Sequence, residues 1–467
     1  MLREHRGFFL GVMLCGLALR LLFLVCVPAV TNDSHVYLDL ANNWLQHGIY
    51  GQTESGQIVP ADTRLPGYPA FLAAGFWIFG GEKIQAIFTA QILLDLLTCL
   101  IVADLARRTV SLRAGKAAFL LAALCPFLAN YSAAILTETL EVFFTALALD
   151  CAVAAVDCMT AEFEMRSAGW LLWTATGASV AASILLRPDG GIVLATVGLY
   201  LLLVIWRNRG VHISPVSVGR ILLAGSLVTV LALAPLVPWA IRNWRVFHQF
   251  QPLAPRYATE SEEITPRGFN RWVGTWMADY TSVEEIYWNV SGDKIDASKL
   301  PRRALDSAKD QTLALIADYN DAPQLTAQID WRFDTVAWER IRAHPFRYYV
   351  VLPTMRVADM WLRPRTELVP SDPRWWEFND DVRGSTLAVA FGAINLFYVT
   401  AAVLGLVWRR REIRHLGLLL CFLVLRTALL WTIENPETRY TLECYPVVIV
   451  LAAALLAGRG VERAQPS

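Results

Sequence analysis

Residues 8–30 read FFLGVMLCGLALRLLFLVCVPAV, and Arg20 is the only charged residue in this run. A helix of this length can cross the hydrocarbon core of a bilayer. Arg3 and Arg6 precede the run, as they would in a signal peptide or a first span. No small-residue cleavage site follows, so we expect a retained span. The whole chain is 55% hydrophobic and only 18% charged, whereas a soluble globule holds about a quarter charged residues.

Similar apolar blocks recur along the sequence and predict an all-α polytopic membrane protein of about ten transmembrane helices. Together with 8–30, the expected spans lie near 84–106, 116–134, 139–158, 168–186, 190–206, 219–241, 386–408, 413–433 and 444–458.

The distribution of arginine predicts how these spans are oriented. If Arg3 and Arg6 lie in the cytoplasm, the positive-inside rule is satisfied by the turns at 107–116, 207–220, 409–414 and 459–463. Only the turn at 157–168 disagrees, because it carries Asp157, Glu162 and Glu164 against Arg166.

This orientation divides the chain into three expected parts. Residues 1–241 form a transmembrane module whose first outer loop is 31–83, 242–385 form a small extracytoplasmic segment, and 386–467 form the C-terminal helices. The formal net charge is zero, so we expect no nucleic-acid partner. The eight cysteines lie in or beside apolar blocks, which argues against disulfides and a zinc site.

The first outer loop begins with a predicted interfacial helix. Tyr37, Leu40, Ala41, Trp44 and Leu45 recur at helical spacing, while His35, Asp39, Asn42, Asn43 and Gln46 face the other way. One interpretation is that Asp33 or Ser34 only caps this helix. The other is that Asp33 belongs to a functional site.

Further ionisable and aromatic residues fall on the expected outer turns. Each alone could be a residue that pairs or reaches toward the interface, but their shared side suggests one site beside lipid. They are Arg64, Tyr68, Glu138, Arg187, Asp189, Arg242, Glu437, Arg439 and Tyr440. Arginines hold phosphate oxygens through paired hydrogen bonds, and a carboxylate can remove a proton from an incoming hydroxyl or amine. This combination suits glycosyl transfer from a polyprenyl-phosphate sugar.

Several motifs resemble those of a known family. Asp33-Ser34-His35-Val36-Tyr37, the turn at 48–51 and Arg64-Leu65-Pro66-Gly67-Tyr68-Pro69 resemble the first loop of GT-C-fold membrane glycosyltransferases. The resemblance is to the bacterial family related to dolichyl-phosphate-mannose–protein mannosyltransferases and lipid A aminoarabinose transferases. Other motifs match in the same order, namely Thr137-Glu138, Leu186-Arg187-Pro188, Pro238-Trp239 with Arg242-Asn243, and Arg439-Tyr440.

This resemblance implies Asp33 as the catalytic residue, although many relatives have a second acid where Ser34 stands here. It also implies a bacterial inner-membrane location with the site facing the periplasm. A divalent metal is possible in such enzymes, and oxygen ligands would favour Mg or Mn over Zn.

We therefore expect an inverting transferase with Asp33 as general base and Glu138 assisting. The expected substrate-binding residues are Arg64, Tyr68, Arg187, Arg242, Arg439 and Tyr440. The expected partners are a polyprenyl-phosphate sugar donor, membrane lipid, and a lipid, glycan or protein acceptor.

Two other functions remain open at this point. A transporter or flippase would also have many spans, but the span interiors hold few charges: Arg20, Asp95, Asp104, Glu141, Asp150 and Arg426. The aromatic outer segment could instead belong to a scaffold protein.

Overall fold

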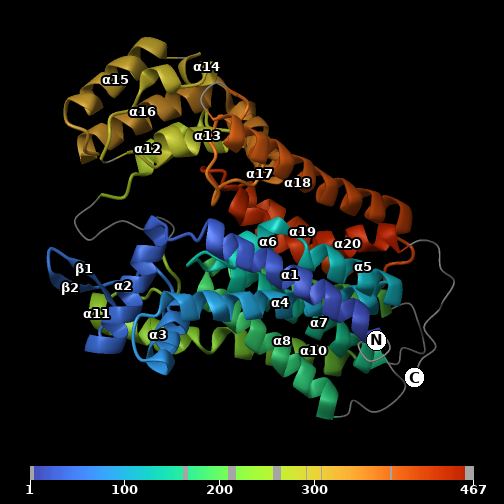
Figure 1. Ribbon diagram of the computed structural model, residues 1–467. Coiled ribbons are helices and arrows are strands. Elements are labelled where there is room, and N and C mark those ends of the chain that lie inside the picture. Colours follow the sequence, from blue (N-terminus) through green and yellow to red (C-terminus); the bar gives the residue numbers. More distant parts are fainter. Residues whose placement is uncertain are drawn as a thin grey trace. The chain divides into compact units, whose positions relative to one another are not determined.

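The computed structural model describes residues 5–160, 167–208, 217–255, 264–290, 292–306, 308–378 and 381–457. The chain forms two compact units (Figure 1). The first comprises residues 1–256, 398–425 and 442–467, and the second comprises 257–397 and 426–441. Several charges used above to orient the spans lie outside the described residues: Arg3, Glu162, Glu164, Arg166, Arg209, Arg459 and Arg463.

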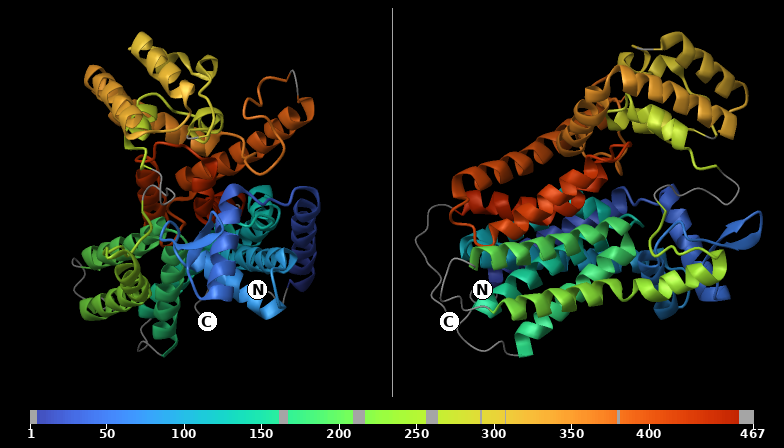
Figure 2. Two further views of the ribbon diagram at one scale, coloured as in Figure 1. Left: turned by 90° about the vertical axis from the view of Figure 1, so that its left-hand side faces the viewer. Right: turned by 180° about the vertical axis from the view of Figure 1, so that it is seen from behind.

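Long apolar helices build the first unit and run side by side (Figure 2). They are α1 (Arg6–Cys26), α4 (Ile84–Thr109), α7 (Glu138–Thr160), α8 (Ser167–Leu186), α9 (Gly191–Asn208), α10 (Val218–Leu233), α11 (Leu236–Phe247) and α20 (Tyr445–Leu456). Two further helices, α18 (Val382–Arg409) and α19 (Leu416–Leu430), contribute residues to both units.

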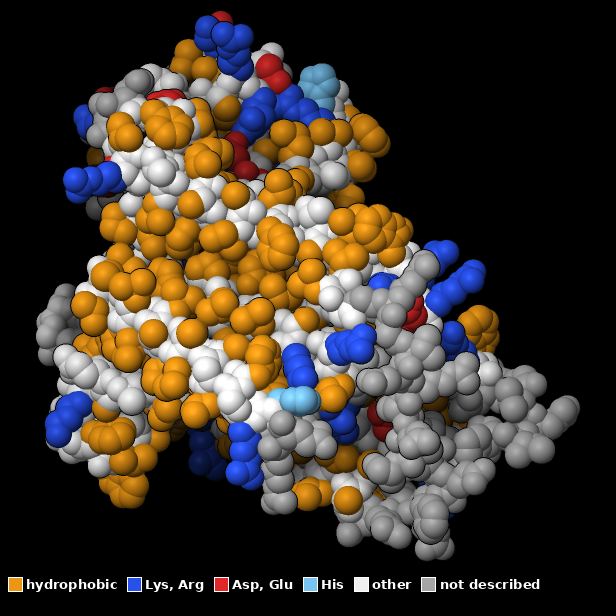
Figure 3. All heavy atoms as spheres, turned by 45° about the vertical axis from the view of Figure 1, so that its right-hand side comes forward, with side chains coloured by type: hydrophobic (Ala, Val, Ile, Leu, Met, Phe, Trp, Pro, Cys, Tyr) orange, Lys and Arg blue, Asp and Glu red, His pale blue; other side chains and the backbone are white. Residues whose placement is uncertain are grey.

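Within the described residues, eight helical segments are long and apolar enough to cross a membrane, with α10 and α11 together forming one of them. The expected span at 413–433 is the shorter apolar helix α19. The one at 116–134 is two short helices, α5 (Leu112–Ala123) and α6 (Pro126–Tyr131). Pro126 separates them because proline cannot donate a helical hydrogen bond. Hydrophobic side chains cover much of the surface in Figure 3, as lipid-facing helices require. The chain is an all-α multi-pass membrane protein.

The first outer loop contains a β-hairpin that the sequence analysis did not expect. It follows α2 (Asn32–His47) and precedes α3 (Gly67–Phe79). The strands β1 (Gly51–Glu54) and β2 (Gln57–Pro60) pair antiparallel, and both turn residues have positive φ, Ser55 at 49° and Gly56 at 80°.

Polar side chains of α2 attach this hairpin to the helix. The Asp39 carboxylate accepts hydrogen bonds from the backbone N–H (2.6 Å) and hydroxyl (2.8 Å) of Thr53. Asn43, expected to face outward, is buried and donates to the Gly51 carbonyl at 3.0 Å. The outward placement of Asn43 was therefore wrong, because the hairpin covers that side of the helix.

A close contact fixes the start of α3 against the end of α8. A Cβ added at Gly67 would lie 2.6 Å from the carbonyl carbon and oxygen of Leu185. Only glycine therefore fits this approach without moving the backbone. The contact brings the Arg64 turn to the end of α8.

A buried ion pair joins three helices inside the first unit. The Arg20 guanidinium of α1 donates to the Asp95 carboxylate of α4 at 2.6 Å, and to the carbonyls of Gly16 (2.9 Å) and Ala123 (2.6 Å). Both charged side chains are buried. Pairing of this kind is what makes such charges tolerable among apolar helices.

Pairing also accounts for the turn that disagreed with the positive-inside rule. Asp157 lies 2.6 Å from an Arg414 guanidinium nitrogen and 2.9 Å from His415 Nε2. His415 in turn shares a hydrogen bond of 2.7 Å with the Tyr200 hydroxyl. The negative charge of Asp157 is therefore matched by the arginine-rich turn at 409–414.

The second unit is a small helical bundle around an aromatic core. Its helices are α12 (Arg267–Gly274), α13 (Tyr280–Ser282), α14 (Arg302–Leu305), α15 (Lys309–Asp321), α16 (Ala327–Ala343) and α17 (Leu352–Leu362). Trp272, Trp276 and Tyr319 are fully buried there. Phe333, Val336, Ala337 and Ile341 recur at helical spacing, and all four are buried in α16.

Residues Arg347–Val351 form a π-helical segment that leads directly into α17, which begins at Leu352 and has Pro353 in its first turn. Proline is tolerated in the first turn of a helix because the N–H groups there have no helical partner.

We predict that Arg20→Met lowers the free energy of unfolding by about 3–5 kcal/mol, because it leaves the Asp95 charge buried and unpaired. The double variant Arg20→Met/Asp95→Leu should regain much of this loss. Thermal unfolding of the detergent-solubilised chain measures both. If the single and double variants are equally destabilised, the pair does not provide the charge compensation described here.

We also predict that Gly67→Ala costs about 1–3 kcal/mol, because the methyl group meets the backbone of Leu185. Gly198→Ala is the matched control, since a Cβ there has no neighbour within 4 Å. Equal thermal midpoints for the two variants would contradict the close contact.

Candidate functional site

The candidate site begins at the first turn of α2. Thr31 is the N-cap, and its side chain and that of Ser34 form a reciprocal capping box. Of the two residues in the capping interpretation, Ser34 takes part in the cap and Asp33 does not. Its carboxylate instead accepts a hydrogen bond from an Arg64 guanidinium nitrogen at 2.8 Å, and both side chains are partly exposed, at 30% and 26%.

Tyr37 lies where several charged groups meet. Its ring packs edge-on against Tyr68 with centroids 5.0 Å apart, and the Arg64 guanidinium carbon lies 5.9 Å from the Tyr37 centroid. Burial raises the pKa of Tyr37 to about 12; the charges of Arg64 and Arg187 oppose this rise, and those of Asp33 and Glu138 add to it. The Tyr37 hydroxyl is therefore within electrostatic reach of both acids and both arginines.

Tyr68 is fully buried and fixes the neighbouring helices. Its hydroxyl donates to the Gln91 side-chain oxygen at 2.7 Å, and the Gln91 amide donates to the Ala134 carbonyl at 2.6 Å. Tyr68 therefore has a structural role, because its fixed ring packs against that of Tyr37.

Arg187 is surrounded by carboxyl groups. It follows α8 and precedes the short 3-10 helix η1 (Pro188–Gly190). Its guanidinium nitrogens lie 3.6 Å from Glu138, 3.5 Å from Glu141 and 3.4 Å from Asp189. Glu138 and Glu141 lie in the first turn of α7 and are buried. A guanidinium therefore stands where these acids converge.

The structure adds Glu141 and Glu443 to the site. Glu443 is buried as well. The spacing of three residues between Glu138 and Glu141 could have indicated a shared helix face. Glu443 directly precedes the expected span at 444–458, and no spacing in the sequence indicated that it belongs to the site.

Arg242 forms hydrogen bonds with the first outer loop. Its guanidinium donates to the carbonyls of Tyr50 (2.6 Å) and Ala61 (2.8 Å) and to the Asn243 side chain (2.9 Å). It also lies over the rings of Tyr50, Trp239 and Phe247. These contacts make Arg242 an anchor for the ends of the hairpin.

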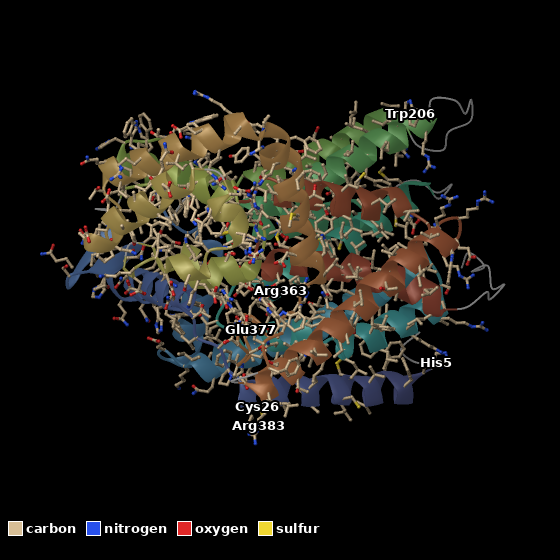
Figure 4. The ribbon with its side chains drawn as sticks, turned by 90° about the horizontal axis from the view of Figure 1, so that it is seen from above. His5, Cys26, Trp206, Arg363, Glu377 and Arg383 are labelled. Atoms are coloured by element: carbon tan, nitrogen blue, oxygen red, sulfur yellow. The ribbon has the colours of Figure 1, made fainter. Side chains whose placement is uncertain are left out.

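Arg439 and Tyr440 lie in the second unit and share an acid. Glu437 lies 2.6 Å from Arg439 Nε and accepts hydrogen bonds from the Tyr440 hydroxyl (2.7 Å) and the Asn435 amide (3.0 Å). Burial raises the pKa of nearby Glu367 to about 7, against the charges of Arg365, Arg363 and Arg439. Figure 4 labels Arg363, in the turn after α17 of this unit.

The described residues provide no group of three His, Cys, Asp or Glu side chains arranged to hold a metal ion. Among the acids of the first unit, Glu138, Glu141 and Asp189 have the Arg187 guanidinium as their neighbouring positive charge. The expectation of Mg or Mn therefore has no ligand set among the described residues, and we assign no step to a metal.

Comparisons with known proteins were made for sequence and structure. Residues 62–239 match the family described as dolichyl-phosphate-mannose-protein mannosyltransferase. No curated protein matches the sequence.

Several solved structures are similar in fold. The archaeal oligosaccharyltransferase AglB from Archaeoglobus fulgidus, in complex with an inhibitory peptide and a dolichol-phosphate, has a TM-score of 0.55 and 14% identity, over 98% of this chain and 50% of that one. The same archaeal enzyme with Zn and sulfate has a TM-score of 0.54 and 14% identity, over 95% and 48%. This chain thus spans about half the length of the archaeal enzyme.

A third similar structure is ArnT from Cupriavidus metallidurans bound to undecaprenyl phosphate. It has 15% identity, over 97% of this chain and 78% of that one, and its TM-score of 0.42 is too low for a conclusion. The family match and the archaeal structures agree: residues 62–239 are similar to the family of dolichyl-phosphate-mannose-protein mannosyltransferases, and the chain shares its fold with a membrane glycosyltransferase, the archaeal oligosaccharyltransferase.

Proposed function

We propose that this protein transfers a sugar from a polyprenyl-phosphate-linked donor to an acceptor, with inversion, on the extracytoplasmic side of the membrane. One observation carries the proposal. The partly exposed Asp33–Arg64 pair lies beside Tyr37, which is also within electrostatic reach of Glu138 and Arg187. A carboxylate and two guanidiniums thus gather from segments far apart in the sequence.

The position of the site along the helices supports the extracytoplasmic side. In Figure 4, His5 at the start of α1 and Trp206 near the end of α9 lie toward one end, and Cys26 at the end of α1 lies toward the other. Asp33 follows α1, whereas Arg207 follows Trp206 in the chain. The positive-inside rule assigns the arginine-bearing end to the cytoplasm.

The chemistry requires one base and a stabilised leaving group. Asp33 removes the proton from an acceptor hydroxyl or amine as that atom attacks the anomeric carbon of the sugar. The bond from this carbon to the phosphate oxygen breaks, and the polyprenyl phosphate leaves with the electron pair. Arg64 orients Asp33, and a single base opposite the leaving group gives inversion, as in inverting glycoside chemistry.

Guanidiniums would stabilise the departing phosphate. In the first unit, Arg64 and Arg187 are the candidates. For Arg439 and Tyr440, in the second unit, binding of the lipid phosphate stays the prediction made from the sequence. Glu138 would shape the acceptor side. Arg242 would instead hold the loop that carries Asp33, since two backbone carbonyls of that loop accept its hydrogen bonds.

The comparisons support a lipid-phosphate donor. The matched family is described by its dolichyl-phosphate-mannose donor, and the archaeal structure contains a dolichol-phosphate. The acceptor proposed here remains one of three classes: lipid, glycan or protein.

Charged residues in the membrane-spanning helices pair with one another, and this favours sugar transfer over a transport function. Asp95 is bound by Arg20, and Asp104 by Arg107 and Arg108. Transporters keep charged or unwound segments near the midplane for their substrate, whereas these charges bind each other.

We predict that Asp33→Asn lowers the rate of sugar transfer by about a hundredfold to ten-thousandfold, the usual contribution of a general base. Donor binding should change little. Glu82→Gln is the control, because Glu82 is an exposed acid of the same loop, bonded to Asn42. Transfer from a radiolabelled polyprenyl-phosphate sugar measures the rate. Substantial turnover by Asp33→Asn would remove Asp33 from the mechanism.

We also predict that Arg439→Ala weakens donor binding by about tenfold to a hundredfold, since hydrogen bonds to charged groups contribute about 1.5–3 kcal/mol. Arg439→Lys should restore part of it. Glu437→Gln controls for disruption of the local turn, because Glu437 holds Arg439 and Tyr440. If Arg439→Ala binds the donor as tightly as the wild type, Arg439 does not contact the phosphate.

A further inference from the structure

One helical segment of the second unit, residues 346–362, exposes an apolar stripe. The stripe consists of residues that recur at intervals of four, three and four positions, so they share one side of the helix. They are Val351, Met355, Ala358 and Leu362, and all four are exposed. Phe346, at 69%, and Tyr349, at 58%, are exposed just before the stripe. An apolar surface of this kind indicates an interaction site.

The charged side chains of the same segment are bonded within the second unit. Arg347 pairs with Asp306. Arg356 is buried and donates to backbone carbonyls of this unit. The Asp359 carboxylate accepts a hydrogen bond from the backbone N–H of Tyr280 at 3.0 Å. A helix that faces water has the opposite arrangement, with its polar residues on the exposed side.

Helix α15 of the same unit has the arrangement of a water-facing helix. Its exposed residues include Lys309 and Asp318. Beside the apolar stripe, by contrast, the exposed Thr354 hydroxyl donates to the Val350 carbonyl of its own helix at 2.6 Å. This hydroxyl therefore has a hydrogen-bond acceptor without water. The stripe is suited to an apolar environment, whereas the exposed side of α15 is not.

The C-terminal end of the segment is bound to the middle of a long apolar helix. Asn395 of α18 is buried and donates to the carbonyls of Trp361 (2.8 Å) and Arg363 (3.1 Å) (Figure 1). It lies 14 residues before Arg409, the last residue of α18, and this is about 21 Å along a helix. The hydrocarbon core is about 30 Å thick. If the arginines at 409–411 mark one boundary of the core, Trp361 lies at a depth within it.

The other half of the segment is bound where α19 ends. Trp431 directly follows α19, and its indole N–H donates to the Tyr349 carbonyl at 3.4 Å. It lies 15 residues after Leu416, the first residue of α19, or about 22 Å along a helix. The turn at 410–415 joins α18 and α19, so both depths are measured from the same boundary. Similar depths at the two attachments indicate a helix that lies parallel to the membrane plane.

We infer that residues 346–362 form an in-plane membrane helix whose apolar stripe contacts the acyl chains of the bilayer. Lipid is the occupant because apolar helices hold both parts of the segment at a depth within the core. Amphipathic helices of this kind bury their apolar face about 5–10 Å into the boundary between headgroups and acyl chains. Part of the segment 242–385, which we expected to be extracytoplasmic, thus belongs to the bilayer. The inference does not depend on sugar transfer.

The test uses the wild-type, full-length protein in nanodiscs made with a phospholipid whose acyl chain carries a photoreactive diazirine. After irradiation, mass spectrometry of the peptides locates the lipid adducts. We expect adducts on the peptide that contains the apolar stripe, and on α18 as the positive control. Helix α15 is the matched negative control, because it belongs to the same unit and exposes charged residues.

Oxidation of Met355 gives a second readout on the same protein. Methionine in contact with water is oxidised readily to the sulfoxide. In nanodiscs exposed to a water-soluble oxidant, Met355 should remain reduced, because acyl chains cover it. After the protein is unfolded in denaturant, the same residue should be oxidised, which shows that the oxidant reacts with it.

The lipid adducts decide the outcome. Adducts on the apolar stripe support the membrane helix. Their absence, with α18 labelled, overturns it, and Met355 then identifies the true surroundings of the stripe. Oxidised Met355 would place the stripe in water, and protected Met355 would place it against another protein surface, such as a second copy of this chain. Neither result bears on the proposed sugar transfer, so the two proposals stand or fall separately.

Discussion

An unpaired charge in or beside lipid is unfavourable in free energy, and the packing of the helices in this structure depends on avoiding it. Arg20 and Asp95 satisfy each other between α1 and α4, and Asp157 is matched by Arg414 and His415. Each pairing joins segments distant in the sequence, so charge compensation also fixes how the helices pack. Around Arg187, three carboxyl groups converge on one guanidinium, and clusters of ionisable groups of this kind often mark functional sites.

The length and spacing of the apolar blocks were enough to predict a multi-pass helical protein, since only helices and closed barrels satisfy the backbone in lipid. Hydropathy could not predict where helices stop. Pro126 divides one expected span because it lacks an N–H, a local effect that average hydropathy hides. The hairpin was missed for a related reason: Ser55-Gly56 is a turn signal, but the strands beside it are short. Once they form, they bury Asn43, which the helical pattern alone places in solvent.

The sequence predicted that the candidate site residues share one side of the membrane, and it predicted their geometry only in part. Topology alone placed Asp33, Arg64, Glu138 and Arg187 on one side of the membrane. These residues can approach one another because the backbone at Gly67 packs closely against that of Leu185. No side-chain pattern in the sequence indicates that Leu185 is the partner of Gly67. Arg242 shows a further limit. Its acceptors are mostly backbone carbonyls, which every residue has, so the sequence could not separate an anchoring arginine from a phosphate-binding one.

The Arg20–Asp95 pair and the Asp33–Arg64 pair differ in solvent exposure. This difference distinguishes a structural ion pair from one that is suited to chemistry. The Arg20 guanidinium is buried and bonded to a carboxylate and three carbonyls, and removing the carboxylate would leave a buried charge unpaired. The Asp33–Arg64 pair is partly open to solvent, where an ion pair contributes about 1 kcal/mol or less. A guanidinium in such a pair can exchange a carboxylate for a phosphate oxygen at little cost.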